Sequence, residues 1–152
     1  MKMNKKGVTL IELIVVMAII AIGAVLTVPN LGPWMANYRL RSATRDITSN
    51  LRTAQMRAVS NNLDYQVFIA GGSYTLQRDS LGLSWVNEGK ANTLPTGITI
   101  SNNTFPAMGT TPAGSSLFRP NSSSNGGKIE LTNTKNTRTI TVSPSTGRIT
   151  NQ

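Results

Sequence analysis

Residues 1–30 read MKMNKKGVTLIELIVVMAIIAIGAVLTVPN, and Glu12 is the only ionisable side chain between Val8 and Val28. In an α-helix the residues from Val8 to Val28 would span roughly 31 Å, which matches the hydrocarbon thickness of a bilayer. A charge within such a span costs about 2.5–3.5 kcal/mol at its centre and less near its ends. The segment therefore predicts a membrane helix whose one carboxylate needs a partner.

The residues around this apolar run indicate its orientation in the membrane and help to distinguish a cleaved signal peptide from a membrane anchor. Three lysines, at positions 2, 5 and 6, precede it, so the positive-inside rule keeps the N-terminus cytoplasmic. A secretory signal peptide would have an apolar region of about 7–15 residues and a small-residue cleavage site. No such site stands before Pro29. A plain signal anchor stays open as an alternative.

The stretch KKGVTLIEL, residues 5–13, resembles the processing site of type IV prepilins and type II secretion pseudopilins. This resemblance implies a leader of residues 1–7 that a prepilin peptidase removes after Gly7. Val8 would then be the methylated N-terminal residue, and Glu12 would be the family's glutamate. The one departure is Val8, where the family usually has phenylalanine.

The resemblance also supplies a partner for the carboxylate of Glu12. Removal of the leader would create an ammonium group at Val8, and two opposite charges in an apolar layer gain by pairing. In pilins the glutamate is thought to meet the N-terminal amine of a neighbouring subunit, which sets the register of assembly. A proton relay is the rival interpretation, although a relay usually needs further titratable groups nearby.

Two prolines, Pro29 and Pro33, are expected to break the helix just beyond the span, because proline removes a backbone donor and clashes with the preceding turn. An amphipathic helix then continues through residues 29–62 and is expected to end near Asn61 and Asn62. Its apolar stripe, at spacings of three and four, is expected to pack on the head. The stripe consists of Ala36, Leu40, Ala43, Ile47, Leu51, Ala54 and Ala58.

The opposite face of this helix is basic. A solvated surface explains these arginines, and a stripe that binds phosphates or lipid headgroups is the alternative. The residues concerned are Arg41, Arg45 and Arg52.

Residues 63–152 have the alternation of a β-rich head. DYQVFIA and SYTLQR flank Gly71 and Gly72, which predicts a hairpin because glycines accept the positive φ angles of a tight turn. LSWVN, GITIS, SSLFR and GRIT are expected to be strands, GKIELTN and TRTITVS a second hairpin, and most of residues 102–125 an ordered loop. The fold class is therefore α+β. A long N-terminal helix, membrane-embedded at residues 8–28, packs on an antiparallel β-sheet as in the pilin fold.

The head resembles the GspH/FimT branch of minor pilins, through SSLFRPNSSSNGGKIEL and RTITVSPSTGRI. That resemblance implies a single-pass protein of the bacterial inner membrane with a periplasmic head. It would join a type II secretion pseudopilus or a type IV pilus, and the sequence does not distinguish these machines. Its partners would be the peptidase, other pilin or pseudopilin subunits, the inner-membrane assembly platform and membrane lipid.

A pilus-associated DNA receptor is the alternative function. The chain has a formal charge of +9, which suits an anionic partner. Thr150 stands where DNA-binding relatives tend to have a second arginine, which disfavours this alternative. The residues expected to contact DNA phosphates would be Arg119, Lys128, Arg138 and Arg148, with Lys135 nearby.

Enzymatic chemistry is not indicated. The chain has no histidine and no cysteine, which excludes thiolate and imidazole catalysis and zinc–thiolate sites. The five carboxylates outside the apolar run are scattered, without metal-loop or acid/base spacing. We therefore predict no catalytic residue, cofactor or metal.

Overall fold

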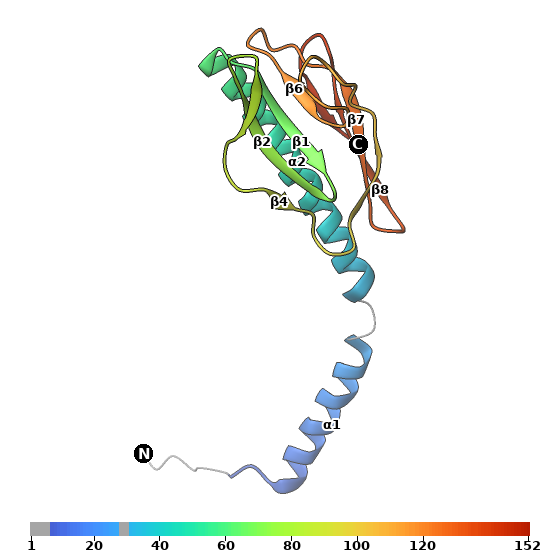
Figure 1. Ribbon diagram of the computed structural model, residues 1–152. Coiled ribbons are helices and arrows are strands. Elements are labelled where there is room, and N and C mark those ends of the chain that lie inside the picture. Colours follow the sequence, from blue (N-terminus) through green and yellow to red (C-terminus); the bar gives the residue numbers. More distant parts are fainter. Residues whose placement is uncertain (1–6, 28–30) are drawn as a thin grey trace, which may run out of the picture. The chain divides into compact units, whose positions relative to one another are not determined.

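The structure is a computed structural model that describes residues 7–27 and 31–152. Helix α1 (Leu10–Thr27) is followed by α2 (Leu31–Asn61) and then by the strands of the head (Figure 1). Two compact units are Met1–Met35 and Ala36–Gln152, so the boundary of the compact head falls inside α2. Nine strands follow α2: β1 (Tyr65–Ala70), β2 (Ser73–Ser80), β3 (Ser84–Asn87), β4 (Asn92–Thr93), β5 (Thr99–Asn103), β6 (Ser116–Phe118), β7 (Gly127–Thr132), β8 (Thr137–Val142) and β9 (Ile149–Asn151).

Both ends of α2 have a local physical cause. Pro33 is the third residue of the helix, where its missing N–H costs nothing because the first four amides of a helix have no intrahelical partner. Pro33 therefore lies in the first turn of α2, Pro29 lies outside the described residues, and the helix break expected at these two prolines stays a prediction. At the other end, Asn62 has φ +53°, the left-handed conformation that commonly follows a helix. The predicted end near Asn61 and Asn62 is confirmed.

The strands form two antiparallel sheets. Sheet A has the order β3-β2-β1-β6 with β4 also paired to β2, and sheet B has the order β5-β7-β8-β9. Both predicted hairpins are present as β1–β2 and β7–β8, and Gly71 and Gly72 have φ +58° and +77° in the first turn. The α+β prediction is confirmed, and the head contains two sheets where one was expected.

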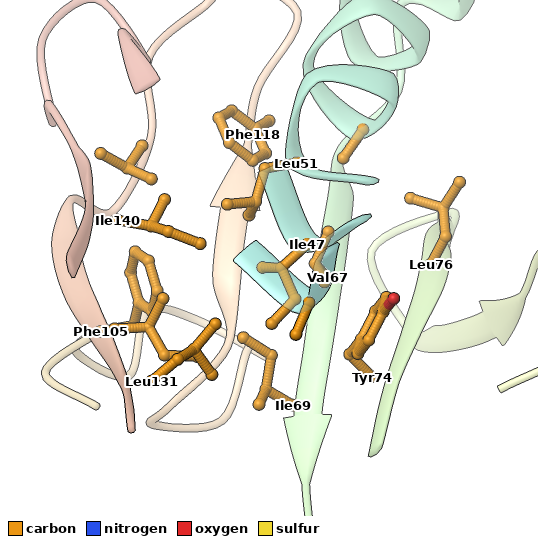
Figure 2. Packing of buried hydrophobic residues seen from close by; sticks show 14 of the residues in the cluster. Ile47, Leu51, Val67, Ile69, Tyr74, Leu76, Phe105, Phe118, Leu131 and Ile140 are labelled. Atoms are coloured by element: carbon orange, nitrogen blue, oxygen red, sulfur yellow. The ribbon is translucent and has the colours of Figure 1, made fainter. Parts of the chain in front are cut away.

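One hydrophobic core joins α2 to both sheets. Figure 2 shows side chains of α2, sheet A and sheet B gathered in a single cluster. Of the predicted stripe, Ala36 is partly exposed, whereas the six residues from Leu40 to Ala58 are at most 2% exposed. The stripe predicted from helical periodicity is therefore the contact between the helix and the sheets.

The polar loop between β5 and β7 is held by a buried amide. Asn125 donates to the carbonyl oxygens of Pro106 and Ser115, at 2.8 Å each, and accepts from the N–H of Leu117 at 3.0 Å. Gly127, with φ +143°, lies so close to Phe105 that a Cβ there would be 2.7 Å from that ring. A long loop rich in serine, asparagine and glycine is ordered in this way, as predicted.

The N-terminal helix is described by itself. Its large apolar side chains from Val8 to Ile22 are 49–77% exposed. Within residues 7–27 and 31–152, no helix combines the length and apolar character that a bilayer span requires. The membrane span predicted for residues 8–28 therefore stays a prediction.

Leu51→Ala tests the shared core. We expect the free energy of unfolding to fall by about 2–5 kcal/mol, because the change removes buried methyl groups and leaves a cavity between two sheets. Urea denaturation followed by circular dichroism would measure the loss. Met56→Ala is the matched control on the same helix, since Met56 is 65% exposed and should cost about 0.5 kcal/mol or less. Equal costs for the two variants would contradict the packing described above.

Candidate functional site

The predicted processing motif lies at the start of α1. Gly7, Val8 and Thr9 precede the helix in an exposed segment without regular secondary structure, and Leu10 is the first helical residue. The backbone N–H of Glu12 donates to Thr9 Oγ1 at 3.4 Å, and the N–H of Leu13 donates to the Thr9 carbonyl at 3.3 Å. Thr9 is therefore the N-cap of α1, and Glu12 occupies the third helical position.

This arrangement gives Glu12 a second physical role. Threonine at the N-cap with glutamate three residues later is the capping-box pattern, and a negative charge in the first turn is favoured by the helix dipole. The exposed Gly7–Val8 peptide bond precedes the first helical residue, Leu10. A peptidase would therefore not have to unwind a helix to reach the bond.

Sheet B separates two of the basic residues predicted to contact DNA. Along a strand, side chains alternate between the two faces of the sheet. Lys128 lies opposite Thr141 on the outer face of the β7–β8 hairpin, whereas Arg138 lies opposite Leu131 on the face that carries the core. Lys128 and Arg138 therefore point to opposite faces.

Lys128 is also engaged within the sheet. Its Nζ lies 2.8 Å from Glu130 Oε1. The hydrogen bond from Lys128 holds the pKa of Glu130 below its ordinary value. The positive charge of Lys128 is thus offset on the surface where it would have to meet a phosphate.

Arg119 and Arg148 lie on other segments than Lys128 and Arg138. Arg119 directly follows β6, where its Nη2 is 3.0 Å from Met108 Sδ. Burial raises the pKa of Asp64, and the charge of Arg119 opposes that rise. Arg148 is exposed, and its carbonyl accepts from the N–H of Ser143, one residue beyond the end of β8. Since Arg138 is the second residue of β8, roughly 17 Å of strand separates these two positions. The four predicted residues do not form one basic patch.

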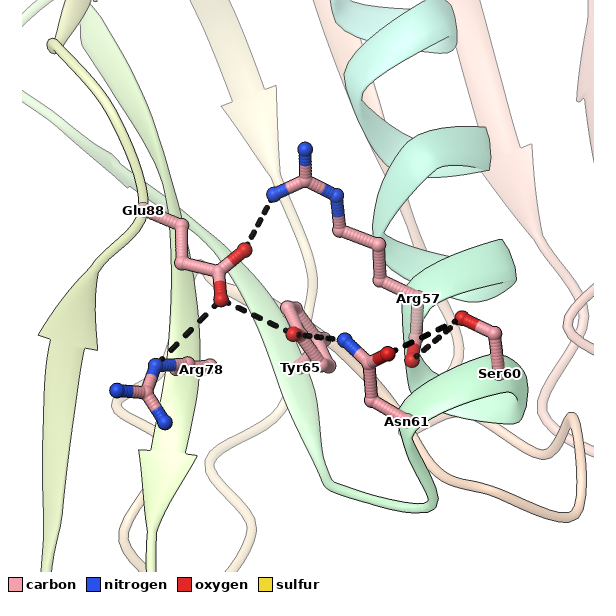
Figure 3. Close-up of polar contacts among 6 residues, drawn as sticks. All are labelled: Arg57, Ser60, Asn61, Tyr65, Arg78 and Glu88. Atoms are coloured by element: carbon pink, nitrogen blue, oxygen red, sulfur yellow. Dashed lines mark hydrogen bonds and ion pairs between the residues drawn. The ribbon is translucent and has the colours of Figure 1, made fainter.

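A polar cluster around Glu88 was not predicted from the sequence. Figure 3 shows its carboxylate bound to Arg57 of α2, to Arg78 of β2 and to the hydroxyl of Tyr65 of β1. The distances are 3.4 Å to Arg78 Nε and 3.0 Å to the Tyr65 oxygen, which in turn accepts from Asn61 Nδ2 at 2.6 Å. Tyr65 is fully buried, and a buried tyrosine hydroxyl needs such partners. In the sequence, only the place of Arg57 next to Ala58 of the apolar stripe hints at this cluster.

This cluster is structural. It fastens the last turns of α2 to β1, β2 and the segment after β3, which supports the same helix–sheet contact as the core. Among the described residues, no group of three or more His, Cys, Asp or Glu side chains could hold a metal ion.

Comparisons with known proteins bear on both parts of the chain. Residues 2–28 match the family described as "Prokaryotic N-terminal methylation motif", and residues 43–146 match "Type II transport protein GspH". No curated protein matches the chain. The fold is similar to that of the minor pseudopilin EpsH from the Type 2 Secretion System of Vibrio cholerae, with a TM-score of 0.61 and 11% identity. That similarity covers 75% of this chain and 96% of the other.

The dispersed basic residues generate a prediction about DNA. We expect the full-length protein in a non-ionic detergent to bind labelled duplex DNA only weakly at physiological salt, because the four predicted residues do not share one face and Lys128 is paired with Glu130. Fluorescence anisotropy across a salt series would measure the affinity and its slope, about −0.9 per phosphate contacted. Arg148→Gln should leave the affinity within about twofold. Sub-micromolar binding that disappears with Arg148→Gln would contradict this expectation.

Proposed function

Because the chain belongs to the GspH family of type II transport proteins, we propose that it is a minor pseudopilin, a low-abundance subunit of a type II secretion pseudopilus. It would help to initiate or cap the filament by packing its N-terminal helix with those of sister subunits. Membership of this family does not favour the alternative function as a DNA receptor.

The observation that carries this proposal is the composition of α1. The helix begins at Leu10, shortly after the Gly7–Val8 junction, and presents large apolar side chains on all sides, with Glu12 in its first turn. A helix that is apolar all round must bury itself in lipid or against other helices. A subunit that is first held in a membrane and then joins a filament would bury this helix in lipid first and against other helices afterwards.

Glu12 would act during the transfer from membrane to filament. After the leader is removed, the ammonium group of Val8 and the carboxylate of Glu12 belong to the same apolar segment. Each charge alone is expensive in that setting, whereas an ion pair between neighbouring subunits offsets much of the cost. The pairing would therefore fix the axial register of one subunit against the next.

The remaining assignments follow from the same proposal. Residues 1–7 would be the leader, residues 8–28 the membrane and assembly helix, and the head would lie in the periplasm. The prepilin peptidase, the inner-membrane assembly platform, membrane lipid and other pseudopilins would be the partners. The basic leader would keep the N-terminus in the cytoplasm.

Processing supplies the first test of this function. We expect the protein extracted from cells that contain prepilin peptidase to begin with N-methylvaline at position 8. Intact-mass and N-terminal peptide mass spectrometry would establish this, with a peptidase-deficient strain as the control that retains the leader. A mature chain beginning beyond Val28 would identify an ordinary signal peptide and would overturn the proposal.

Assembly supplies the second test, because capping and charge pairing respond differently to substitution. Glu12→Gln keeps a capping-box residue but removes the charge, whereas Thr9→Val removes the cap oxygen and keeps the charge. If pairing drives assembly, Glu12→Gln should reduce cross-linked incorporation into pseudopili by about tenfold or more, equivalent to about 1.4 kcal/mol.

Thr9→Val should leave incorporation within about twofold, provided that mass spectrometry shows normal processing of both variants. Equal losses in the two variants would mean that Glu12 acts through the helix end alone.

A further inference from the structure

A groove lies where α2 meets the turn end of the β7–β8 hairpin. Its volume is about 290 Å³, near the lower end of the range for small-ligand pockets. The lining comes from α2, from β8 with the turn before it, and from the segment after β9. It consists of Asn37, Leu40, Arg41, Asn136, Thr137, Arg138 and Gln152.

Two guanidinium groups line this groove, and no aspartate or glutamate side chain does. Arg138 is half-buried and Arg41 is exposed. Within residues 7–27 and 31–152, neither guanidinium makes a hydrogen bond or an ion pair with another side chain or carbonyl. Burial of a charge is costly unless it is paired, so an anion bound in the groove would stabilise Arg138.

The walls of the groove are fixed by hydrogen bonds. Asn37 Oδ1 accepts from Asn133 Nδ2 at 2.9 Å and from Asn136 Nδ2 at 2.7 Å, which ties α2 to the hairpin turn. Asn133 Oδ1 in turn accepts from the N–H of Asn136 at 2.8 Å. Gln152 exchanges two backbone hydrogen bonds with Thr139, at 2.9 and 3.0 Å. Because the oxygen of Asn37 is already engaged twice, the NH₂ end of its amide is the part left for a further acceptor.

We propose that this groove binds a phosphate group. Two guanidinium forks, amide donors and the Thr137 hydroxyl form an array of donors that suits a group with three or four acceptor oxygens better than one with two. Arginine is favoured wherever phosphate oxygens are bound in a bidentate manner. The groove joins Arg138, one of the residues expected to contact DNA, to Arg41 of α2, which was not among them.

Two sources can supply such a phosphate. Tyr38, which is 59% exposed, and Arg45 lie on the same face of α2 as Arg41, at spacings of three and four residues. Exposed aromatic and basic residues close in sequence to an apolar helix are typical of proteins that contact lipid headgroups. A lipid phosphodiester is one source, and a soluble phosphate or phosphate ester is the other.

Nuclear magnetic resonance of the full-length protein in a phosphate-free, non-ionic detergent would test the site. We expect the arginine Nε–H signals of Arg41 and Arg138 to shift saturably as inorganic phosphate replaces chloride at constant ionic strength. Arg138→Gln should weaken binding by about tenfold or more, and Arg138→Lys should weaken it less, because it keeps the charge and loses the planar fork.

The matched control is Arg45→Gln. It also removes one arginine charge, at a position of α2 outside the groove, and should change the affinity for phosphate by less than about twofold. An unchanged backbone spectrum outside the groove would establish that each variant is folded.

The lipid source is distinguished by reconstitution into vesicles. In phosphatidylglycerol vesicles, groove signals already at their bound positions without added phosphate would identify the headgroup as the ligand. Glycolipid vesicles, which contain no phosphate, should restore the unbound positions. Signals that are unshifted in both vesicles and respond to added phosphate would identify a soluble ligand.

Three results would overturn the proposal. They are the absence of any saturable shift, an equal response to acetate at the same ionic strength, and equal weakening by Arg45→Gln and Arg138→Gln.

Discussion

The architecture of the head depends on one face of α2, which packs against both sheets at once. Leu40, Ile47 and Leu51 supply the bulk of that face, and the alanines between them keep it low enough for strands to approach closely. Sheet A and sheet B do not share a continuous hydrogen-bonded ladder, so their common contact with this helix is what makes them one domain. A change in the stripe would therefore affect both sheets, not one.

Periodicity explains why so much of this could be predicted. The spacing of apolar residues in α2 repeats along a single helix, and the paired glycines at positions 71 and 72 mark a local turn, so each feature is encoded within a short stretch. The partition into two sheets is different in kind. It depends on pairings such as β1 with β6 and β5 with β7, which join segments separated by tens of residues and have no local pattern. The buried amide of Asn125 and the carboxylate of Glu88 escaped prediction for the same reason, since their partners lie on other elements.

The proposed functional residues also differ in whether a local pattern reveals them. Gly7, Val8 and Glu12 form a motif within one short stretch, so it could be recognised without knowledge of the fold. The proposed DNA contacts required several cations that are distant in sequence to lie on one face. Lys128 and Arg138 do not meet this requirement, because side chains alternate between the two faces of a sheet. Their positions in the hairpin register place them on opposite faces of sheet B. The groove that does gather two arginines could not be found from the sequence, because it brings together residues almost one hundred positions apart.

The shared core also determines the order in which the head can fold as the chain is synthesised. The stripe on α2 is synthesised early, yet part of its covering comes from Ile129, Leu131, Ile140 and Val142 in later strands. Until the chain has grown as far as Val142, the helix can meet sheet A but cannot close against sheet B. Contacts of such long sequence separation fold slowly, and the incomplete head exposes apolar surface meanwhile. A chain held by its first helix near a membrane would spend that interval tethered, which limits its encounters with other unfinished chains.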